Sequence, residues 1–432
     1  MQAEVYGLDG LPLGAEQFRI EFSPGSGFAG QVYRVTPKAG IIRTGTPGEP
    51  SGPVAIKVLI PMNRWKGAFR DSLFYMSFQA PFAPRLRVEA LRAGMVWQEI
   101  LRIAAEIEFG VRTVIPRPLG YYWDSELCSF AEVHEWIDGR AAKYGVDDGI
   151  LQRLLARTSS PPVTEIGMER AFMQRLANLC RKIGAVGLAR QYEWYTFVSQ
   201  ANVLVRESPA AGTSKFVGVD CRLGLAVPFF LPLSPVHARI IFQGLQRGVY
   251  AHYDEVDFTC LDRYLSAHAA AFAPLEGLVR QLKDDDRNYR QGLPDLWHTR
   301  THILRDPARR ERSKQATAGD WHKLGLISPP ARAAVESRPN AFYGVLALSL
   351  VPFAGPILMK LAGNESYRDH IRGLLRDGRY LRESLEVRRA VDLIAWLDRM
   401  RISPAHARAL NSSMAACLVE KLALSWLPPL FH

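Results

Sequence analysis

The chain has 432 residues, a formal net charge of +11 and a pI of about 9.5. This length allows about two to three domains, and the positive charge attracts anions such as nucleotides, acidic lipids and nucleic acids. The five cysteines are odd in number and scattered, which excludes a disulfide framework by spacing and fits reduced thiols in a cytoplasm.

A glycine-rich segment, GSGFAG at 25–30, separates two stretches that alternate apolar and polar residues as strands do. We therefore expect it at a hairpin tip, where Gly25, Gly27 and Gly30 let backbone N–H groups approach a phosphate. A Rossmann loop would instead lead into a helix. Because glycine clusters also form ordinary turns, this interpretation needs support from residues later in the chain.

Lys57 lies in an apolar segment, 53–60, that is typical of a strand. A lysine is unexpected there unless its ammonium group has a partner. A long helix is expected at 85–109, where apolar residues recur at helical spacing. Glu99 on this helix is the first choice of partner and Glu89 the alternative, although most glutamates on a helix are simply solvated.

Residues 121–139 predict two strands around a turn, ending in FAEVHEWIDG at 130–139. With the glycine hairpin and Lys57, this sequence resembles the nucleotide site of the protein-kinase-like superfamily. The resemblance is closest to the atypical branch, which includes the UbiB/AarF group, aminoglycoside-phosphotransferase-like enzymes and lipopolysaccharide-core kinases.

The resemblance implies that ATP binds in this part of the chain. Lys57 would then contact the α- and β-phosphates and pair with a helix glutamate such as Glu99. The end of the 130–139 segment would form the hinge that joins two kinase lobes. Backbone groups there would bind adenine, at Glu135 and Trp136. Apolar side chains would enclose the base: Val32, Ala55 and Val203.

After a helix expected at 167–189, the segment TFVSQANVLV at 196–205 matches only the end of a kinase catalytic loop. Asn202 matches the metal-binding asparagine, but the position of the catalytic aspartate, five residues earlier, is Phe197. A strand at 216–219 then leads to Asp220, where the resemblance implies an aspartate that binds Mg²⁺. One carboxylate and one amide, with phosphate and water, suit Mg²⁺, and the alternative is a turn residue at the end of a strand.

Three interpretations of the missing aspartate remain open. The protein is a pseudokinase that binds nucleotide without transferring phosphate, or a displaced carboxylate such as Glu193 acts instead, or an insertion at 190–195 shifts the register. Removing a general base costs orders of magnitude in rate, although phosphoryl transfer also depends on positioning and charge. We therefore expect weak or atypical phosphotransfer or ATPase activity with Lys57, Glu99 and Asp220 at its centre, or no transfer.

The last part of the chain carries a faint repeat, because WHKLGLISP at 321–329 recurs as WLDRMRISP at 396–404. In each copy serine predicts an N-cap and proline the first helical position, so both copies predict helix, turn, helix. Between them, residues 341–361 are uncharged for about 19 positions but are interrupted by Pro352 and by Gly355 and Pro356. They predict either a buried, broken helical hairpin or a segment that dips into an anionic membrane surface, helped by nearby arginines.

Nucleic acid is not expected as the partner, since zinc-finger spacing, an RNA-binding aromatic signature and a helix-turn-helix pattern are all missing from the sequence. His298 and His302 could share a metal on one helix face, but no third ligand is evident and a solvated pair is favoured. The N-terminal sequence has neither a basic run nor an apolar core, so we expect no signal peptide and a cytoplasmic protein, peripheral to a membrane at most.

The expected fold class is α+β, with a two-lobed kinase-like fold followed by an all-helical C-terminal domain. We place the N-lobe at 1–137, the C-lobe at 138–290, a basic linker at 291–320 and the helical domain at 321–432. The expected ligands are ATP and Mg²⁺. The expected further partner is a protein or an anionic membrane surface that meets the helical domain.

Overall fold

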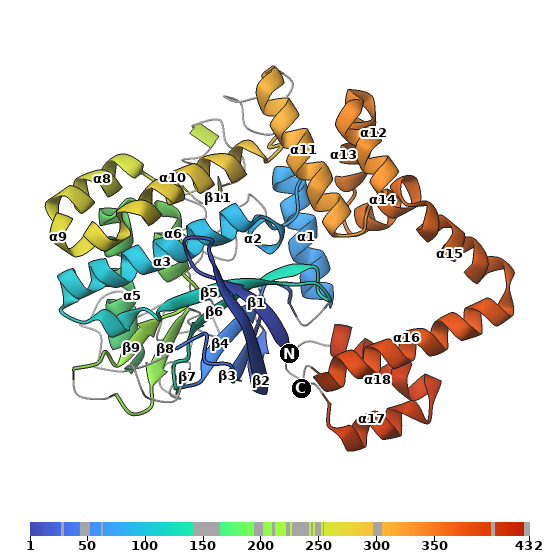
Figure 1. Cartoon of the computed structure of the whole chain (residues 1–432), viewed down its shortest axis with the longest axis horizontal. Helices are drawn as coiled ribbons and strands as arrows, with labels where there is room; N and C mark the ends of the chain where they lie inside the picture. The colour runs from blue at the N-terminus through green and yellow to red at the C-terminus, as the bar shows by residue number, and fades with distance from the viewer. Residues whose placement is uncertain are drawn as a thin grey trace.

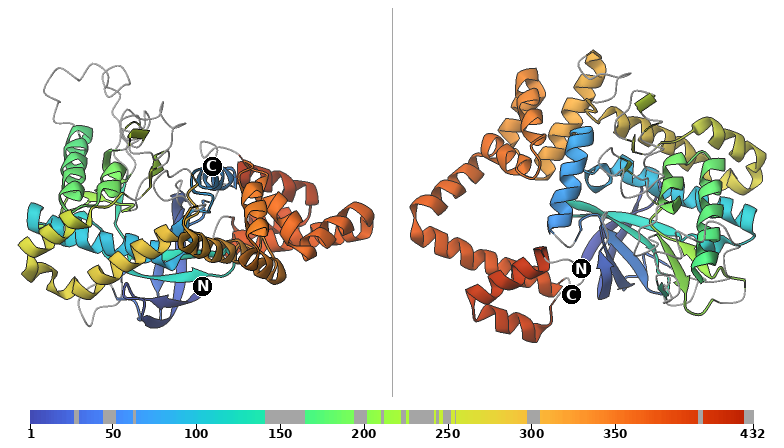
Figure 2. Two further views of the ribbon diagram at one scale, coloured as in Figure 1. Left: turned by 90° about the horizontal axis from the view of Figure 1, so that it is seen from above. Right: turned by 180° about the vertical axis from the view of Figure 1, so that it is seen from behind.

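The computed structural model describes residues 1–26, 30–43, 52–61, 64–140, 165–193, 202–209, 212–221, 225–226, 242, 245–246, 252–253, 255–296, 305–398 and 402–426. It is a mixed structure of helices and strands (Figure 1). A small barrel and the helices up to α10 form one body. Helices α11 to α18 lie on one side of the barrel, and α5 and β9 lie on the other side (Figures 1 and 2).

Six strands close into a barrel in the order β1-β2-β3-β4-β6-β5, and all neighbours are antiparallel. Their bounds are β1 Gln2–Tyr6, β2 Pro12–Ser26, β3 Gln31–Pro37, β4 Val54–Val58, β5 Pro118–Asp124 and β6 Ser129–Glu135. Alternate side chains point inward because successive residues of a strand face opposite sides. The resulting core includes Val35, Val54, Ile56, Val58 and Val133. The glycine hairpin is confirmed as β2–β3, with Gly25 opposite Val32.

The long helix expected at 85–109 is divided between α2 (Ala83–Leu86) and α3 (Val88–Phe109). Arg87 separates them because its backbone is extended, with φ −110°, and its guanidinium group turns to Asp320. Helix α3 ends at Gly110, whose φ of 71° lies in the left-handed region that suits glycine. It packs on both of its sides, since Leu91 and Met95 join one core cluster and the apolar residues between 96 and 105 join another. Helix α1 spans Arg64–Phe78 and η1 spans Arg112–Val114.

The single helix expected at 167–189 is also two helices, α5 (Glu165–Lys182) and α6 (Val186–Glu193). Gly184 lies between them with φ 83°, and a Cβ atom at this position would stand 2.1 Å from the carbonyl oxygen of Asp257. The break is therefore dictated by close packing as well as by the turn.

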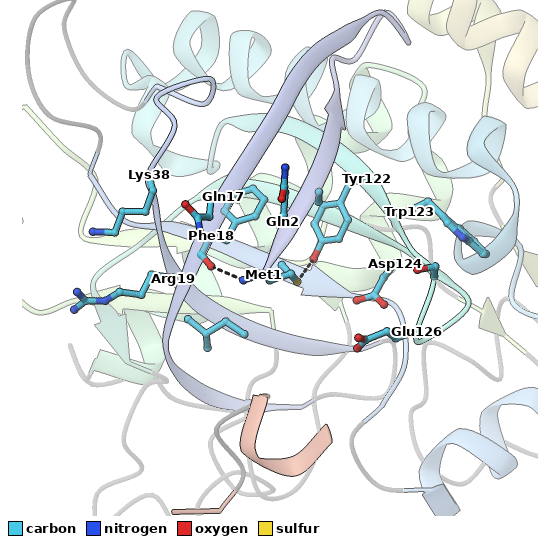
Figure 3. A pocket seen from close by; sticks show the side chains of 13 residues that line it. Met1, Gln2, Gln17, Phe18, Arg19, Lys38, Tyr122, Trp123, Asp124 and Glu126 are labelled. Atoms are coloured by element: carbon cyan, nitrogen blue, oxygen red, sulfur yellow. Dashed lines mark hydrogen bonds between the residues drawn. The ribbon is translucent and has the colours of Figure 1, made fainter. Parts of the chain in front are cut away.

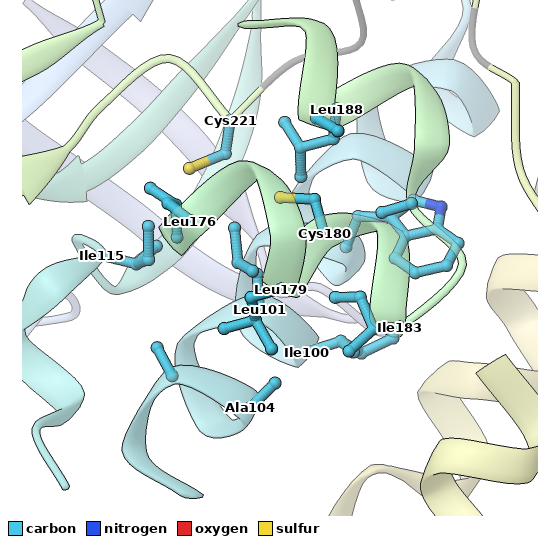
Figure 4. Packing of buried hydrophobic residues seen from close by; sticks show 14 of the residues in the cluster. Ile100, Leu101, Ala104, Ile115, Leu176, Leu179, Cys180, Ile183, Leu188 and Cys221 are labelled. Carbon is cyan, nitrogen blue, oxygen red and sulfur yellow. The ribbon is translucent and has the colours of Figure 1, made fainter. Parts of the chain in front are cut away.

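A three-stranded sheet lies beside these helices, with the order β7-β8-β9. Its strands are β7 Gly139–Arg140, β8 Val203–Arg206 and β9 Phe216–Gly218. The other elements of this part are β10 Leu225–Ala226, β11 His252–Tyr253, α8 Phe258–Ala267, α9 Ala269–Phe272, η4 Ala273–Leu275 and α10 Glu276–Gln291. Figure 4 shows the apolar cluster that joins α5 and α6 to α3.

The C-terminal part is helical throughout its described residues. Its helices are α11 Pro307–Lys323, α12 Pro329–Ser337, α13 Pro339–Ser349, α14 Gly355–Gly363, α15 Glu365–Arg376, α16 Gly378–Asp398, α17 Pro404–Asn411 and α18 Met414–Trp426. In both copies of the repeat the serine stands at the N-cap position, Ser328 before α12 and Ser403 before α17. The Ser403 side chain accepts from the N–H of His406, whereas the Ser328 side chain makes no cap hydrogen bond. The tryptophan of each copy is buried, Trp321 in a cluster with α13 and α14 and Trp396 in a smaller cluster.

The uncharged segment 341–359 lies in α13, the turn after it and α14. Phe342, Leu346 and Met359 are buried against Trp321, so part of the segment belongs to a protein core. Phe353, in the turn, stacks on Trp65 of α1 with ring centroids 5.0 Å apart. Within the described residues, every helix is too short or too polar to cross a bilayer.

The range expected as a linker, 291–320, contains most of α11. Arg87 and Asp320 form an ion pair of 2.6 Å in which both side chains are almost completely buried. Lys323 donates to the carbonyl oxygen of Leu86 at 2.9 Å. Helix α11 is therefore packed on the start of α3.

Candidate functional site

The structure brings Lys57 and Asp220 into direct contact. Lys57 Nζ lies 2.5 Å from Asp220 Oδ1, and the side chains are 13% and 26% exposed. Strand β4 positions the lysine, because Val54, Ile56 and Val58 point into the barrel and leave Ala55 and Lys57 on the opposite face. A partly buried ammonium group in an apolar strand thus has the anionic partner that its position requires.

The β8–β9 pair places Asn202 and Asp220 side by side. Asn202 precedes β8, Asp220 follows β9, and the N–H of Val219 donates to the carbonyl oxygen of Asn202 at 2.8 Å. Both residues have positive φ, 77° for Asn202 and 57° for Asp220. Such backbone is uncommon for residues other than glycine, although asparagine and aspartate adopt it more readily than most, and it is found at turns and at functional sites.

Gln191 of α6 fixes the amide of Asn202. The Nδ2 atom of Asn202 donates to the backbone oxygen and to Oε1 of Gln191, each at 3.0 Å. Because both acceptors need the amide nitrogen, the Oδ1 atom of Asn202 faces away from them and keeps its lone pairs. Asn202 Oδ1 and the Asp220 carboxylate are the hard oxygen donors that Mg²⁺ prefers. Sequence reasoning missed Gln191, since only the contact between α6 and β8 reveals it.

Among the described residues there is no group of three or more His, Cys, Asp or Glu side chains placed to hold a metal ion. A metal at Asn202 and Asp220 would therefore need further ligands from a phosphate or from water, as Mg²⁺ commonly does. His298 and His302 lie outside the described residues.

Glu99 is engaged by its own helix. Its two carboxyl oxygens accept from Arg102 at 2.5 and 2.8 Å, and the pair is only slightly exposed. Glu89 lies in the first turn of α3, where a carboxylate suits the helix dipole. Within the part of the chain that the structure describes, Lys57 pairs with Asp220 and not with either glutamate.

A different carboxylate stands beside Lys57. Glu132 of β6 is the cross-strand partner of Lys57 in the β4–β6 register and is 5% exposed. His134 Nε2 lies 3.1 Å from Glu132 Oε2, and His134 Nδ1 lies 3.2 Å from Gln98 Nε2 of α3. Sequence reasoning missed these three residues. The available signal was a glutamate two positions from a histidine in a strand, because that spacing places both on one face.

The glycine hairpin lies next to this group. Val32 of β3 is the register partner of Lys57, and a Cβ atom on Gly30 would stand 2.2 Å from the carbonyl oxygen of Val58. Only glycine therefore fits at position 30 with this backbone. Gly25 is in β2, whereas Gly27 lies outside the described residues.

Two of the residues expected around an adenine, Glu135 and Trp136, lie at the end of β6 and directly after it. The N–H of Glu135 donates to the carbonyl oxygen of Arg117 at 2.9 Å. The indole N–H of Trp136 donates to Asp138 at 2.7 Å, and the Arg34 guanidinium group lies 5.3 Å from its ring centroid. Ala55 is half-buried on the face of Lys57, and Val203 is buried in the cluster of Figure 4.

The position expected for the catalytic aspartate, Phe197, lies outside the described residues. Glu193 is the last residue of α6. Cys221, next to Asp220, is buried, and its sulfur lies 3.3 Å from the Tyr192 hydroxyl. Burial raises the pKa of the Cys221 thiol to about 12. The thiol therefore stays protonated at neutral pH and is a poor nucleophile.

A cavity of about 870 Å³ lies elsewhere, at β1, β2 and the β5–β6 turn (Figure 3). Arg19 and Lys38 stand on one side of it, and Asp124 and Glu126 on the other. None of its lining residues belongs to the set around Lys57.

No family model matches the chain, and a search of curated proteins found no match. Among solved structures, the chain is similar to the crystal structure of a double mutant of the Mycobacterium tuberculosis PknI kinase domain. The two share 16% sequence identity over 81% of this chain and 94% of that chain, with a TM-score of 0.23. Because that TM-score is low, we base the function on contacts within this chain.

Proposed function

We propose that this protein is a kinase-like protein that binds ATP together with Mg²⁺. The observation that carries the proposal is the contact between Lys57 Nζ and Asp220 Oδ1, which joins residues 163 positions apart in the sequence. A strand lysine and an aspartate after a strand hairpin are the two charges that hold the phosphates and the metal in kinase-like sites.

The fold supports a two-lobed interpretation. The barrel with α3 would form the first lobe, and α5 to α10 with β7-β8-β9 the second. Glu135 and Trp136 lie where β6 leaves the barrel, and β7 begins at Gly139 in the other sheet. Backbone groups of this connection would bind the adenine, with Val32, Ala55 and Val203 around it.

The chain supplies residues that fit a magnesium-bound nucleotide. Asp220 and the free Oδ1 of Asn202 would hold the cation, which would neutralise phosphate charge. Lys57 would exchange the Asp220 carboxylate for phosphate oxygens. The backbone of the β2–β3 hairpin, including Gly25 and Gly30, would cover the phosphates, since glycine allows close approach.

With Phe197 at the position of the catalytic aspartate, the site would catalyse slow, atypical phosphotransfer or weak ATP hydrolysis. The second candidate is a pseudokinase scaffold that presents its C-terminal helices to a protein or to an anionic membrane. The packing of α11 on the start of α3 favours a structural link between the nucleotide site and those helices. The location proposed for either is the cytoplasm.

A thermal shift measurement tests the shared premise. ATP with Mg²⁺ is expected to raise the Tm of the wild type, and Asp220→Ala is expected to lose most of this rise. Asp262→Ala, which removes an exposed carboxylate of α8, is the matched control. An unchanged wild-type Tm at millimolar nucleotide would remove the proposal.

Release of radioactive phosphate from ATP labelled at the γ-position then separates the two candidates. The enzyme predicts more release from the wild type than from Asp220→Ala. If the wild type and Asp220→Ala both fold and release phosphate equally at the background rate, the result would favour the pseudokinase scaffold. Flotation with liposomes tests the membrane partner, and complete retention of the protein in the soluble fraction with anionic lipid would exclude it.

A further inference from the structure

Lys57 has a second carboxylate within reach. In the β4–β6 ladder it stands opposite Glu132, on the same face of the sheet. Directly opposed residues of antiparallel strands have Cβ atoms about 5 Å apart, which a lysine side chain spans without moving the backbone. Ala55 and His134 form the next register pair on that face, so His134 is the diagonal neighbour of Lys57.

Glu132 is held in place from the far side. Gln98 Nε2 donates to the carbonyl oxygen of Pro116 at 2.8 Å and lies 3.2 Å from His134 Nδ1. Since the amide nitrogen only donates, His134 Nδ1 accepts and the ring proton resides on Nε2. That proton points at Glu132, 3.1 Å away. The chain Gln98–His134–Glu132 therefore runs from α3 to the carboxylate that stands opposite Lys57, with each donor facing an acceptor.

Glu99, the glutamate that the resemblance favours, is bound twice by Arg102. Glu132, by contrast, accepts from His134 and stands opposite Lys57 in the β4–β6 ladder.

We propose that Glu132 on β6 is the positioning residue for Lys57, holding its ammonium group toward the phosphates when Asp220 is engaged by the metal. The proposal rests on the nucleotide-binding function proposed above. It replaces a helix carboxylate by a strand carboxylate. Glu132 stays opposite Lys57 because β4 and β6 are joined by their own hydrogen bonds, and the contact between Gln98 and His134 links this pair to α3.

The test is a double-mutant cycle on the Kd of ATP with Mg²⁺, measured by calorimetry on the full chain. Glu132→Gln keeps the shape and removes the charge, and we expect Kd to rise about tenfold or more. Lys57→Met is expected to weaken binding at least as much. If Glu132 acts through Lys57, the double variant binds no more weakly than Lys57→Met alone. A purely structural role would instead make the two losses add.

Two further variants sharpen the cycle. Glu126→Gln, on the turn at the far end of the same β5–β6 hairpin, removes an equal charge and is expected to leave Kd within about twofold. Glu132→Asp, which keeps a carboxylate, is expected to recover part of the affinity lost in Glu132→Gln. Should Glu132→Gln not fold, His134→Gln frees Glu132 without removing it and is expected to raise Kd several-fold.

The contrary outcomes are distinct. Wild-type affinity in Glu132→Gln, or in His134→Gln where that variant is used, overturns this inference and leaves the proposed function intact. So does additivity with Lys57→Met, or a loss in Glu99→Gln that Glu132→Gln does not share. A wild type that does not bind ATP with Mg²⁺ overturns both proposals.

Discussion

Lys57 on β4 and Asp220 after β9 meet at 2.5 Å, although they belong to different sheets. Under the proposed function, substitutions of the two residues should weaken ATP binding in different ways. Lys57→Met should weaken ATP binding with or without Mg²⁺, because its ammonium group would contact phosphate directly. Asp220→Asn should remove only the Mg²⁺-dependent part, since an amide is a weaker metal ligand than a carboxylate. Calorimetric titrations with ATP, with Mg²⁺ or with a chelator, distinguish the two, and identical losses in both media would contradict the assignment.

Gln191 is expected to matter through Asn202. Gln191→Leu removes the side-chain acceptor for Asn202 Nδ2 and leaves the backbone acceptor in place. Loss of a residue that orients a metal ligand typically costs about 10- to 100-fold in metal affinity, so the Mg²⁺ concentration for half-maximal thermal shift with ATP should rise by about tenfold. Gln174→Leu is the control, because Gln174 bonds to Asn178 on the exposed side of α5. An unchanged Mg²⁺ dependence in Gln191→Leu would show that the Gln191 side chain does not orient Asn202 as a metal ligand.

Glu169 of α5 predicts a pH dependence of stability. It is fully buried, neither carboxyl oxygen has a hydrogen-bond partner among the described residues, and burial raises its pKa from 4.5 to about 7. Between these values the folded protein holds a proton that the unfolded chain has lost, so stability falls as the pH rises through this window. Glu169→Gln should abolish that slope and gain up to ~3 kcal/mol above the folded pKa.

Denaturant titrations from acid to alkaline pH check this prediction. Glu276→Gln, an exposed carboxylate on α10, is the control and should leave the slope unchanged. A slope that survives in Glu169→Gln assigns the effect to another group.

Adding one methyl group at Gly30 is expected to lower the free energy of unfolding. In Gly30→Ala the Cβ atom would overlap the Val58 carbonyl oxygen at 2.2 Å, so β3 and β4 must move apart. We expect a loss of about 2 kcal/mol or more, in the range of overpacking. Gly94→Ala is the matched control, because a Cβ there meets nothing within 4 Å and the site is inside α3. It should be stabilising by about 0.5–1 kcal/mol. Urea unfolding measures both, and equal stability of the two variants would contradict the tight approach of β3 to β4.

The Arg87–Asp320 pair predicts that α11 unfolds with the body. Asp320→Ala leaves a buried guanidinium group without its carboxylate, which typically costs about 3–5 kcal/mol. Arg87→Met combined with Asp320→Leu should recover much of that loss, since an apolar pair of similar volume avoids the unpaired charge. Unfolding followed by circular dichroism should remain one transition in the wild type. A separate early transition of the C-terminal helices would contradict the coupling.

Part of the fold and of the candidate site could be predicted from the sequence. The β2–β3 hairpin, the strand of Lys57 and the helix starts at Ser328 and Ser403 follow from local patterns of alternation and capping. The breaks at Arg87 and Gly184 do not, because they depend on Asp320 and Asp257, which are distant in the sequence. The order of elements along the chain suggested a helix glutamate as the partner of Lys57. Only the register of β4 against β6 places Glu132 opposite the lysine.

The left-handed backbone at Asn202 and Asp220 bears on how this chain can change during evolution. Glycine, asparagine and aspartate are the residues that adopt this backbone most readily, so most other replacements at either position would strain the turn. Glycine would keep the turn but would remove the amide or the carboxylate. Exchanges between asparagine and aspartate would therefore keep both the backbone and an oxygen donor at these positions.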